Sequence, residues 1–236
     1  MKGGTVIRLI TVESRSCRFL GLYLIHRDNF WTISWEVGGM TKLQRLVLIG
    51  SILGDGFLQK TGKNNARLRL EHGLKQKEYL IWKCQILENF FQSKPVILKR
   101  KNPIFGKTYQ YIRAQSYSNQ EFGEFYRLFY NEGRKIIPEQ ISTLLNDPLG
   151  LAVWFMDDGY FYARDKMAYI YLPKYDQTSI NNLLLVLSNN FDLFPTLKIK
   201  KRGEYVLVFP VQETAKLMFI IRNFVITSMN YKLPSQ

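Results

Sequence analysis

The chain has 236 residues, 46% of them hydrophobic, which suffices for one large domain or two small ones. Lys and Arg number 33 against 19 acids, giving a formal net charge of +14 and a pI near 9.7. This balance is typical of proteins that bind nucleic acid. No apolar run approaches the roughly 20 residues of a membrane span, so no membrane partner is expected.

Cysteine and histidine are too scarce for the common zinc sites. The chain has Cys17, Cys84, His26 and His72, without a C-x-x-C spacing, whereas structural zinc uses about four close ligands. The distant cysteines favour a reducing compartment over a disulfide framework. A catalytic metal would therefore be held by carboxylates, which select a hard cation such as Mg²⁺.

Residues 1–39 differ from the rest and are treated as an N-terminal extension of unknown role, with short β-like runs at 4–11 and 30–37 and with Met40 as an alternative start. A helix is expected over 41–53, opened by a T-x-x-Q capping box of Thr41 and Gln44 and ended at Gly54-Asp55-Gly56. The next expected elements are strands at 57–60 and 67–71, a helix at 76–91, strands at 96–101 and 109–116, and a helix at 119–130. This part closes with Arg134-Lys135-Ile136-Ile137-Pro138.

The same order of elements then restarts. A helix at 148–156 ends at Asp157-Asp158-Gly159, and the chain closes with Asn230-Tyr231-Lys232-Leu233-Pro234. Between them we expect strands at 160–163 and 168–172, a helix at 179–191, strands at 197–201 and 205–210, and a helix at 211–224. The recurrence predicts two diverged repeats of order αββαββα, at 40–140 and 141–236, in an α+β fold.

Each repeat places an acid after an apolar helix, where the helix dipole already disfavours negative charge. If the two helices pack side by side, Asp55 and Asp158 come close together, and a divalent cation between them would relieve their repulsion. A single Asp-Gly of this kind is usually only a turn, but two at equivalent places favour function. Gly54 and Asp157 precede these acids and complete the expected metal-ligand set, although Asp157 also fits a solvated helix end.

Metal-assisted phosphodiester cleavage also needs cations for the charge that develops on phosphate. Lys135 and Lys232, one in each repeat, are the candidates. Glu71 could orient metal or water, with a solvated strand end as the alternative, and His72 is expected at the surface or facing DNA. Gly56 and Gly159 are expected to have positive φ, and Trp31, Trp35, Trp82 and Trp154 to lie in the core.

Basic residues cluster on the predicted hairpins, and a β-ribbon of this kind can enter the major groove of DNA. The candidate DNA-binding residues are Lys60, Lys63, Arg67, Arg69, Lys99, Lys101, Arg113, Lys174, Lys198, Lys200 and Arg202.

The segments 48–56 (LIGSILGDG) and 151–159 (LAVWFMDDG) resemble the LAGLIDADG motif. With Glu71, the RKIIP of 134–138 and the YKLP of 231–234, residues 41–236 are similar to the single-chain, two-motif homing endonucleases. The sequence departs from the motif at Ser51 and Leu53, and again at Val153 and Trp154. Lys174 is the nearest counterpart of Glu71 in the second repeat.

The resemblance implies a pair of αββαββα repeats whose motif helices pack at a central pseudo-twofold axis, each with a four-stranded antiparallel, saddle-shaped sheet over the major groove. It implies that Asp55 and Asp158 hold Mg²⁺, for which Mn²⁺ can substitute, and that Lys135, Lys232 and Glu71 support cleavage. Each strand of double-stranded DNA would be cut once at a long site, leaving short 3′ overhangs, in the homing of a host intron.

The alternative function on the same scaffold is an intron RNA maturase, with the protein's own intron RNA as partner. DNA-binding regulation without cleavage and unrelated RNA binding are weaker alternatives, because both aspartates are present and no RRM, KH or zinc signature appears. We expect a monomer inside the cell, in an organelle (mitochondrion or chloroplast) or the bacterial cytoplasm.

Overall fold

The computed structural model describes residues 10–14, 17–21, 39–200 and 203–235. Met1–Val37 and Gly38–Gln236 form separate compact units. In the first, β1 (Ile10–Ser14) pairs antiparallel with β2 (Cys17–Gly21). The expected run at 30–37, with Trp31 and Trp35, lies outside the described residues, as does most of the run at 4–11.

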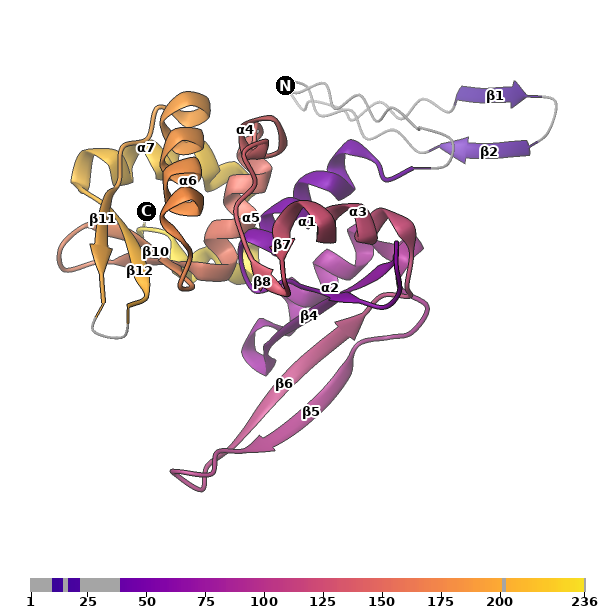
Figure 1. Ribbon diagram of the computed structural model, residues 1–236, viewed down its shortest axis with the longest axis horizontal. Helices are drawn as coiled ribbons and strands as arrows, with labels where there is room; N and C mark the ends of the chain where they lie inside the picture. Colours follow the sequence, from indigo (N-terminus) through magenta and orange to yellow (C-terminus); the bar gives the residue numbers. More distant parts are fainter. Residues whose placement is uncertain (1–9, 15–16, 22–38, 201–202, 236) are drawn as a thin grey trace, which may run out of the picture. The chain divides into compact units, whose positions relative to one another are not determined.

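The second unit opens with a repeat of seven main elements (Figure 1). In chain order these are α1 (Lys42–Leu53), β3 (Phe57–Lys60), β4 (Ala66–Gly73), α2 (Lys77–Ile86), β5 (Val96–Lys101), β6 (Thr108–Gln115) and α3 (Gln120–Phe129). Short 3₁₀ turns, η1 (Leu74–Gln76) and η2 (Glu88–Phe90), flank α2, and β7 (Tyr130–Asn131), β8 (Arg134–Lys135) and α4 (Ile141–Leu144) lead into the next repeat.

The second repeat has the same order of main elements. It comprises α5 (Pro148–Asp158), β9 (Gly159–Tyr162), β10 (Met167–Leu172), α6 (Gln177–Phe191), β11 (Thr196–Ile199), β12 (Tyr205–Phe209) and α7 (Val211–Ile221), followed by η3 (Arg222–Phe224) and η4 (Thr227–Lys232). The predicted αββαββα repeats and α+β class are therefore confirmed.

Helix ends follow local side chains. The hydroxyl of Thr41 accepts from Gln44 N and the side chain of Gln44 accepts from Thr41 N, so the predicted capping box is present. Asn119, Asp147 and Asp176 cap α3, α5 and α6. The helices predicted over 76–91 and 211–224 were too long at one or both ends, because their terminal turns tighten into 3₁₀ geometry.

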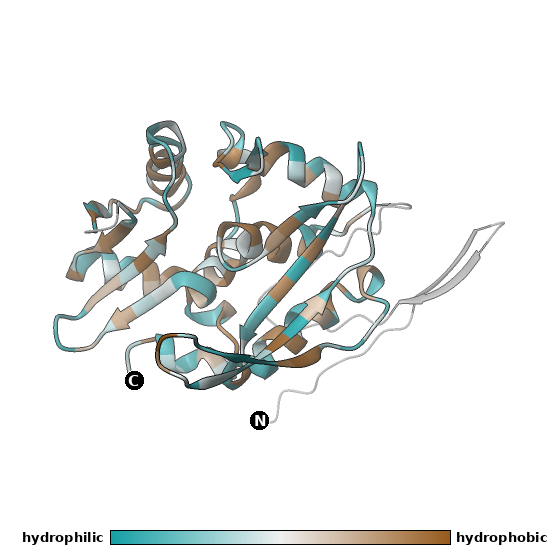
Figure 2. Cartoon of the chain, turned by 60° about the horizontal axis from the view of Figure 1, so that its bottom comes forward, coloured by the Kyte–Doolittle hydropathy of each residue, from teal (hydrophilic) through white to brown (hydrophobic). Residues whose placement is uncertain are grey.

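Both four-stranded sheets are antiparallel, with orders β3-β4-β6-β5 and β9-β10-β12-β11. Alternation along β4 buries Ala66, Leu68, Leu70 and His72 and leaves Arg67, Arg69 and Glu71 half-buried. Figure 2 shows the same alternation of hydrophobic and hydrophilic residues along the strands. One face of each sheet therefore packs on helices, and the other is free for a partner.

The two motif helices, α1 and α5, pack against each other between the sheets. Their approach requires small residues on α1, because a Cβ at Gly50 would lie 2.5 Å from Gly150 O and 2.7 Å from Val153 Cβ. A Cβ at Gly54 would overlap the side chain of Asp157. The interface is asymmetric, since α1 supplies glycines where α5 supplies Val153 and Asp157.

The glycines after the two acids have a different role from the one predicted. Gly159 has φ −79°, and Gly56 is not among the positive-φ glycines, so the predicted positive φ was wrong. A side chain is excluded at Gly56 because its Cβ would lie 2.5 Å from Ser51 O, and Gly159 is equally crowded by Phe155. Close backbone packing, rather than turn conformation, requires glycine here.

Trp154 is fully buried on α5 and Trp82 packs at the edge of the core, as predicted. Within residues 39–200 and 203–235, none of the helices combines the length and the apolar character that a membrane span needs.

Candidate active site

Asp55 and Asp158 line the same cavity, of about 520 Å³, at the ends of the motif helices. Asp55 follows the C-cap of α1, whereas Asp158 is the last residue of α5. Gly54, Lys135 and Lys200 line this cavity as well. The predicted meeting of one acid from each repeat is thus present in the structure.

A lysine from each repeat binds backbone carbonyls beside the acid of that repeat. Lys135 Nζ donates to Gly54 O at 3.0 Å and to Gly56 O at 3.1 Å. Lys232 Nζ donates to Met156 O at 2.6 Å and to Asp157 O at 2.9 Å. The two ammonium groups therefore occupy corresponding places, each fixing the backbone that carries an acid.

Burial lowers the pKa of both lysines, although the acids around them act in the opposite direction. Each side-chain nitrogen is closely held by two backbone carbonyl oxygens. A charge held in place by carbonyl oxygens can face a phosphate without first being reorganised.

Beneath the acids lies a buried polar cluster that the sequence did not reveal. Lys83 Nζ donates to Asp157 Oδ1 at 2.7 Å and to Oδ2 at 2.9 Å, and both side chains are fully buried. Asp157 Oδ2 also accepts the backbone N–H of Asp55 at 3.2 Å. Asp157 is therefore not the solvated helix end that we considered, and it connects α5 to α2 and to the residue after α1.

His72 is buried on β4, so its predicted place at the surface or facing DNA was wrong. Its Nδ1 lies 3.5 Å from Asp55 Oδ2, and its Nε2 lies 3.4 Å from Lys83 Nζ. Because an ammonium only donates, Nε2 is assigned as the acceptor and Nδ1 as the protonated nitrogen facing Asp55. At 3.5 Å this contact is electrostatic rather than a short hydrogen bond.

The two acids have different electrostatic surroundings. Burial raises the pKa of Asp55, but His72 and the charges of Lys83 and Lys232 outweigh it, so the pKa is lowered. Burial and the negative charges of Asp55 and Asp157 raise the pKa of Asp158 to about 8, against the weaker effect of the two lysines. Of Asp55 and Asp158, only Asp55 has neighbouring protein groups that outweigh burial and lower its pKa overall.

The register of β4 and β10 explains why Asp55 and Asp158 have different electrostatic surroundings. Phe57 pairs with Arg69 on β4, and Tyr160, at the same offset from its acid, pairs with Tyr169 on β10. Arg69 and Tyr169 are therefore equivalent positions. Two residues further along each strand, Glu71 corresponds to Tyr171, and one residue beyond that, His72 corresponds to Leu172. Tyr171, rather than Lys174, is the structural counterpart of Glu71, and Leu172 cannot offer Asp158 the proton that His72 directs at Asp55.

Glu71 is tied to arginines on the open face of the first sheet. Its carboxylate accepts from both terminal nitrogens of Arg100, at 2.6 and 2.8 Å, and from Arg113 Nε at 2.7 Å. These hydrogen bonds lower the pKa of Glu71 against the effect of burial. Glu71 thus orders two arginines next to Asp55 and is more than a solvated strand end.

Two groups of acids could hold a metal. Asp55 and Asp158 share the cavity with the Gly54 backbone, and within the described residues Asp55, His72 and Asp157 form a second cluster with ligand atoms within 4.8 Å of one another. In that second cluster Lys83 already occupies both oxygens of Asp157, and an ammonium there competes with a metal ion. The donor set of the shared cavity fits a hard cation better.

Comparison with known proteins decides the family. Residues 45–217 match the sequence profile of the LAGLIDADG DNA endonuclease family. This protein belongs to that family. It is 26% identical over 199 residues to a probable intron-encoded endonuclease 1 of Wickerhamomyces canadensis, covering 82% of this chain and 85% of the relative.

A second relative is much longer than the present chain. A RecA protein of Mycolicibacterium flavescens is 31% identical over 237 residues, which cover 89% of this chain and 53% of the relative. The chain thus spans about half the length of that protein. The homing endonuclease I-WcaI, solved bound to its DNA recognition sequence, has the same fold, with a TM-score of 0.76, 24% identity, and coverage of 87% of this chain and 89% of that one.

The open faces of the two LAGLIDADG sheets differ in chemistry. On the first, Arg67 and Arg69 both donate to Gln59 Oε1, and Arg69 lies over the ring of Phe57. Register places tyrosines on the second, at Tyr160, Tyr162, Tyr169 and Tyr171. An arginine face and a tyrosine face would read different features of a bound duplex.

The predicted DNA-binding residues that the structure describes fall into three groups. Arg67, Arg69 and Arg113 lie on the open face of the first sheet, and Lys198 on that of the second. Lys99 and Lys101 point to the opposite face of β5, where the hairpin extends beyond the helices. Lys60, Lys63, Lys174 and Lys200 are exposed, and Arg202 lies outside the described residues.

Lys83, Tyr79 and the inward His72 are the site-supporting residues that sequence reasoning missed. Lys83 shares a helical face with Tyr79, Leu80 and Leu87, a spacing that marks a lysine on an apolar stripe. Its ammonium also lies 4.4 Å from the centre of the Tyr79 ring, whose hydroxyl donates to Val153 O. A lysine on the apolar face of a predicted helix is therefore a sequence signal for a buried acidic partner.

Proposed function

We propose that this protein is a site-specific DNA endonuclease that requires Mg²⁺ and hydrolyses one phosphodiester bond in each strand of a long duplex site, leaving short 3′ overhangs. The observation that carries the proposal is the single cavity lined by Asp55 and Asp158, with Lys135 and Lys232 bonded to the backbone beside them. Mn²⁺ is expected to substitute for Mg²⁺, since both are octahedral ions that prefer oxygen ligands.

The residues fit a divalent cation. Asp55 and Asp158 offer carboxylate oxygens. Burial, and after it the negative charges of Asp55 and Asp157, raise the pKa of Asp158, and a cation between the two acids would relieve this repulsion. A cation bound there would supply Lewis-acid stabilisation of the scissile phosphate and of an attacking water. Asp157 is assigned a positioning role, because its carboxylate is already paired with Lys83.

The protein's own groups would hold phosphate and backbone in place. Lys135 and Lys232 fix the backbone next to the two acids, and their remaining N–H bonds are available for a phosphate oxygen. Glu71 aligns Arg100 and Arg113 beside Asp55. These groups supply positive charge where negative charge grows during hydrolysis.

Double-stranded DNA is the proposed partner, bound by a monomer across the open faces of the two sheets. The relative from W. canadensis is named as an intron-encoded endonuclease, and I-WcaI was solved on its recognition DNA. By extension we propose homing of a host intron as the biological role, in an organelle or a bacterial cell. The intron RNA maturase role on the same scaffold is the second candidate.

The proposal is tested by incubating the protein with a large randomised or host-genomic DNA pool in Mg²⁺, in Mn²⁺ and in EDTA, then sequencing the ends. Discrete double-strand breaks that share one long sequence and need the divalent ion are expected. The ends also give the overhang polarity and length. Binding without breaks in either ion contradicts the endonuclease, and protein-stimulated splicing of intron RNA in that case would establish the maturase.

A further inference from the structure

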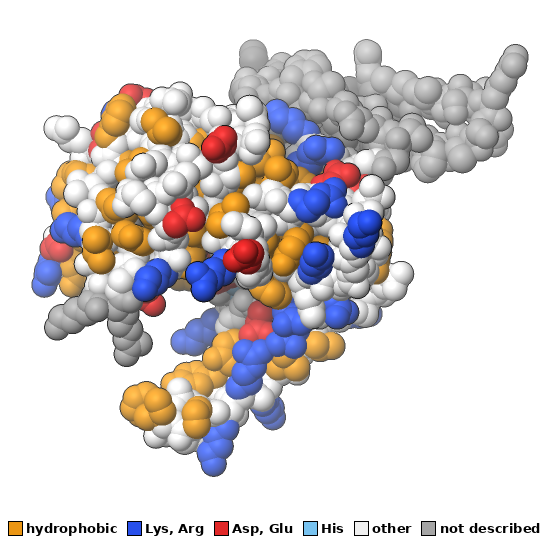
Figure 3. All heavy atoms as spheres, in the orientation of Figure 1, with side chains coloured by type: hydrophobic (Ala, Val, Ile, Leu, Met, Phe, Trp, Pro, Cys, Tyr) orange, Lys and Arg blue, Asp and Glu red, His pale blue; other side chains and the backbone are white. Residues whose placement is uncertain are grey.

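The hairpin of β5 and β6 extends beyond the rest of its sheet (Figures 1 and 3). Pairing of β4 with β6 ends at Gly73 and Tyr111, whereas pairing of β5 with β6 continues to Lys101 and Thr108. The outer part of this hairpin is therefore a two-stranded ribbon that projects from the sheet edge. A ribbon of this width fits the major groove of B-DNA.

The turn at the end of the ribbon is held by local hydrogen bonds. Asn102 Oδ1 accepts from Ile104 N at 2.9 Å and from Phe105 N at 3.0 Å. Asn102 N donates to Lys107 O at 2.7 Å, and Gly106, with φ +64°, donates to Asn102 O at 3.0 Å. The turn is thus pre-organised, with the left-handed residue supplied by glycine.

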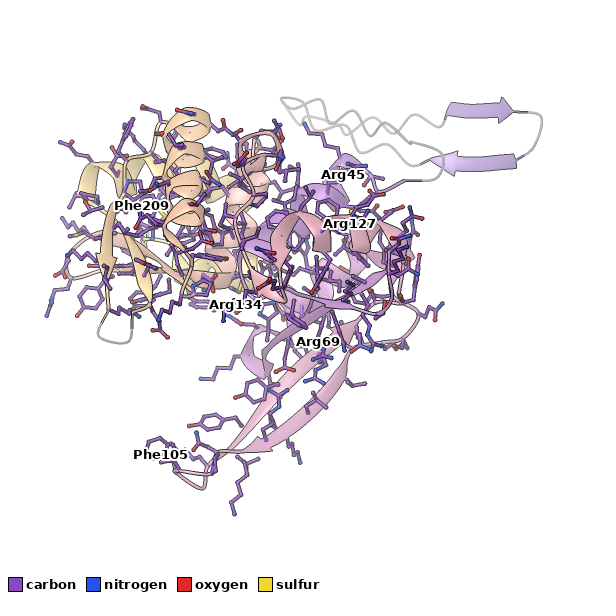
Figure 4. The ribbon with its side chains drawn as sticks, viewed as in Figure 1. Arg45, Arg69, Phe105, Arg127, Arg134 and Phe209 are labelled. Carbon is purple, nitrogen blue, oxygen red and sulfur yellow. The ribbon has the colours of Figure 1, made fainter. Side chains whose placement is uncertain are left out.

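This turn presents large apolar side chains to solvent. Ile104 is 81% exposed and Phe105 is 75% exposed, and Figure 4 shows Phe105 at the outer end of the hairpin, pointing away from the sheet. Hydrophobic side chains gather at the same end in Figure 3. Apolar groups held out on a rigid turn form a ready contact surface, because little backbone freedom is left to lose on binding.

The charge around the turn indicates what the surface contacts. Residues 96–115 contain no acid, and their cations are Lys99, Arg100, Lys101, Lys107 and Arg113. Register places Arg100 and Arg113 on one face of the ribbon and Lys99 and Lys101 on the other. Cations on both faces match a groove with phosphates along both walls, and the Arg113 face continues into Arg69 and Arg67.

We propose that Phe105, supported by Ile104, is an apolar wedge that packs into a base step of the bound duplex and distorts it. Apolar side chains inserted between base steps from the minor groove unstack and bend DNA. A ribbon that enters from the major groove would use the same unstacking chemistry. This inference rests on the proposed DNA-cleaving function and adds a specific contact to it. Phe105 is a DNA-binding residue, not a catalytic one.

The hairpin geometry sets where the distortion falls. Gln115 pairs with Arg69, near the acid, and Thr108 lies seven positions further along β6. At ~3.3 Å per strand residue and 3.4 Å per base pair, Thr108 lies roughly 7 base pairs from the cleavage centre, and Phe105, in the turn beyond it, lies roughly 7 base pairs or more away. The second repeat has only Lys-Lys-Arg-Gly-Glu at 200–204 in the equivalent turn, so one flank alone is distorted.

The test uses the wild-type duplex site found by pool cleavage, with 2-aminopurine placed in turn at each position of both flanks. Binding of the wild-type protein in Ca²⁺ is expected to raise fluorescence at one step, about 7 base pairs or more from the centre on one flank. Phe105→Ala is expected to abolish this signal and to weaken binding about tenfold, with an unchanged slope of log affinity against log salt. Phe219→Ala, which removes an exposed ring on α7, is the matched control and is expected to change neither quantity.

The outcomes separate the two claims. If the wild-type protein neither binds nor cuts DNA, the proposed function fails. If it binds and cuts while Phe105→Ala keeps full affinity and the fluorescence is flat on both flanks, the wedge is contradicted. If Phe105→Ala instead changes only the sedimentation of the free protein, the turn is a contact between protein chains and the DNA wedge is overturned.

Discussion

The ammonium of Lys83 and the carboxylate of Asp157 form a fully buried ion pair that joins the two repeats, with N–O distances of 2.7 and 2.9 Å. Lys83 lies on α2 of the first repeat, and Asp157 on α5 of the second. Asp157 Oδ2 also accepts the backbone N–H of Asp55. Because Asp157 directly precedes Asp158, the ion pair holds the backbone of Asp55 next to that of Asp158. The cluster thus couples the two halves of the candidate active site.

Breaking this pair is expected to be costly. Lys83→Met leaves the Asp157 carboxylate buried without a countercharge, and such losses typically destabilise by ~3–5 kcal/mol. Urea unfolding measures the change. Because the cost comes from the unpaired charge, the double variant Lys83→Met/Asp157→Asn should recover part of the loss. A destabilisation below about 1 kcal/mol in Lys83→Met would contradict the assigned pairing.

The close approach of the motif helices can be tested at Gly54. A Cβ there overlaps Asp157, so Gly54→Ala must separate the helices and is expected to lower the free energy of unfolding by about 1–3 kcal/mol. It should also slow cleavage by displacing Asp55. Gly62→Ala is the matched control, since no atom lies within 4 Å of its added Cβ. Equal stability of the two variants would show that α1 and α5 pack differently.

The raised pKa of Asp158 makes metal-free stability depend on pH. Its pKa is about 8 in the folded protein against an ordinary value of 3.8. Between these values the folded state binds a proton that the unfolded state lacks, so this group's contribution to stability is lost as pH rises through the window. In EDTA, the wild type should therefore lose more stability from pH 5.5 to 7.5 than Asp158→Asn. Identical profiles of stability against pH for the wild type and Asp158→Asn would contradict the raised pKa of Asp158.

The lysines beside the acids are expected to act on rate rather than on affinity. Lys135→Met and Lys232→Met should each lower the single-turnover cleavage rate by about 10²-fold or more, while DNA affinity in Ca²⁺ changes by only a few-fold. Lys77→Met is the control, because Lys77 is exposed on α2. A parallel loss of rate and affinity would mean that these lysines act as ordinary phosphate contacts.

The repeat, the two motif helices and the meeting of Asp55 with Asp158 were predictable from sequence, because they rest on local apolar periodicity and on a signal that occurs twice. The capping box of Thr41 and Gln44 was predictable for the same reason, since its partners are three residues apart. Helix ends were less predictable: Leu87, with φ −97° and ψ 23°, departs from helical geometry where the 3₁₀ turn of Glu88–Phe90 begins.

The buried cluster could not be placed from sequence in the same way. Lys83 and Asp157 meet only after the repeats pack, so no local pattern states their distance. The direction of His72 was in reach, since it continues the buried alternation of Leu68 and Leu70 on β4. Its histidine identity suggested a surface residue, and the period-two pattern was the better guide.

The most direct test of the central claim is strand-resolved cleavage of the mapped duplex site in Mg²⁺ by the wild type, Asp55→Asn and Asp158→Asn. DNA binding in Ca²⁺ and circular dichroism would be measured on the same samples. The account predicts that the wild type cuts both strands, that neither variant makes a double-strand break, and that both variants stay folded and bind the site. Double-strand cleavage by either folded variant at the wild-type rate would contradict the shared acidic site.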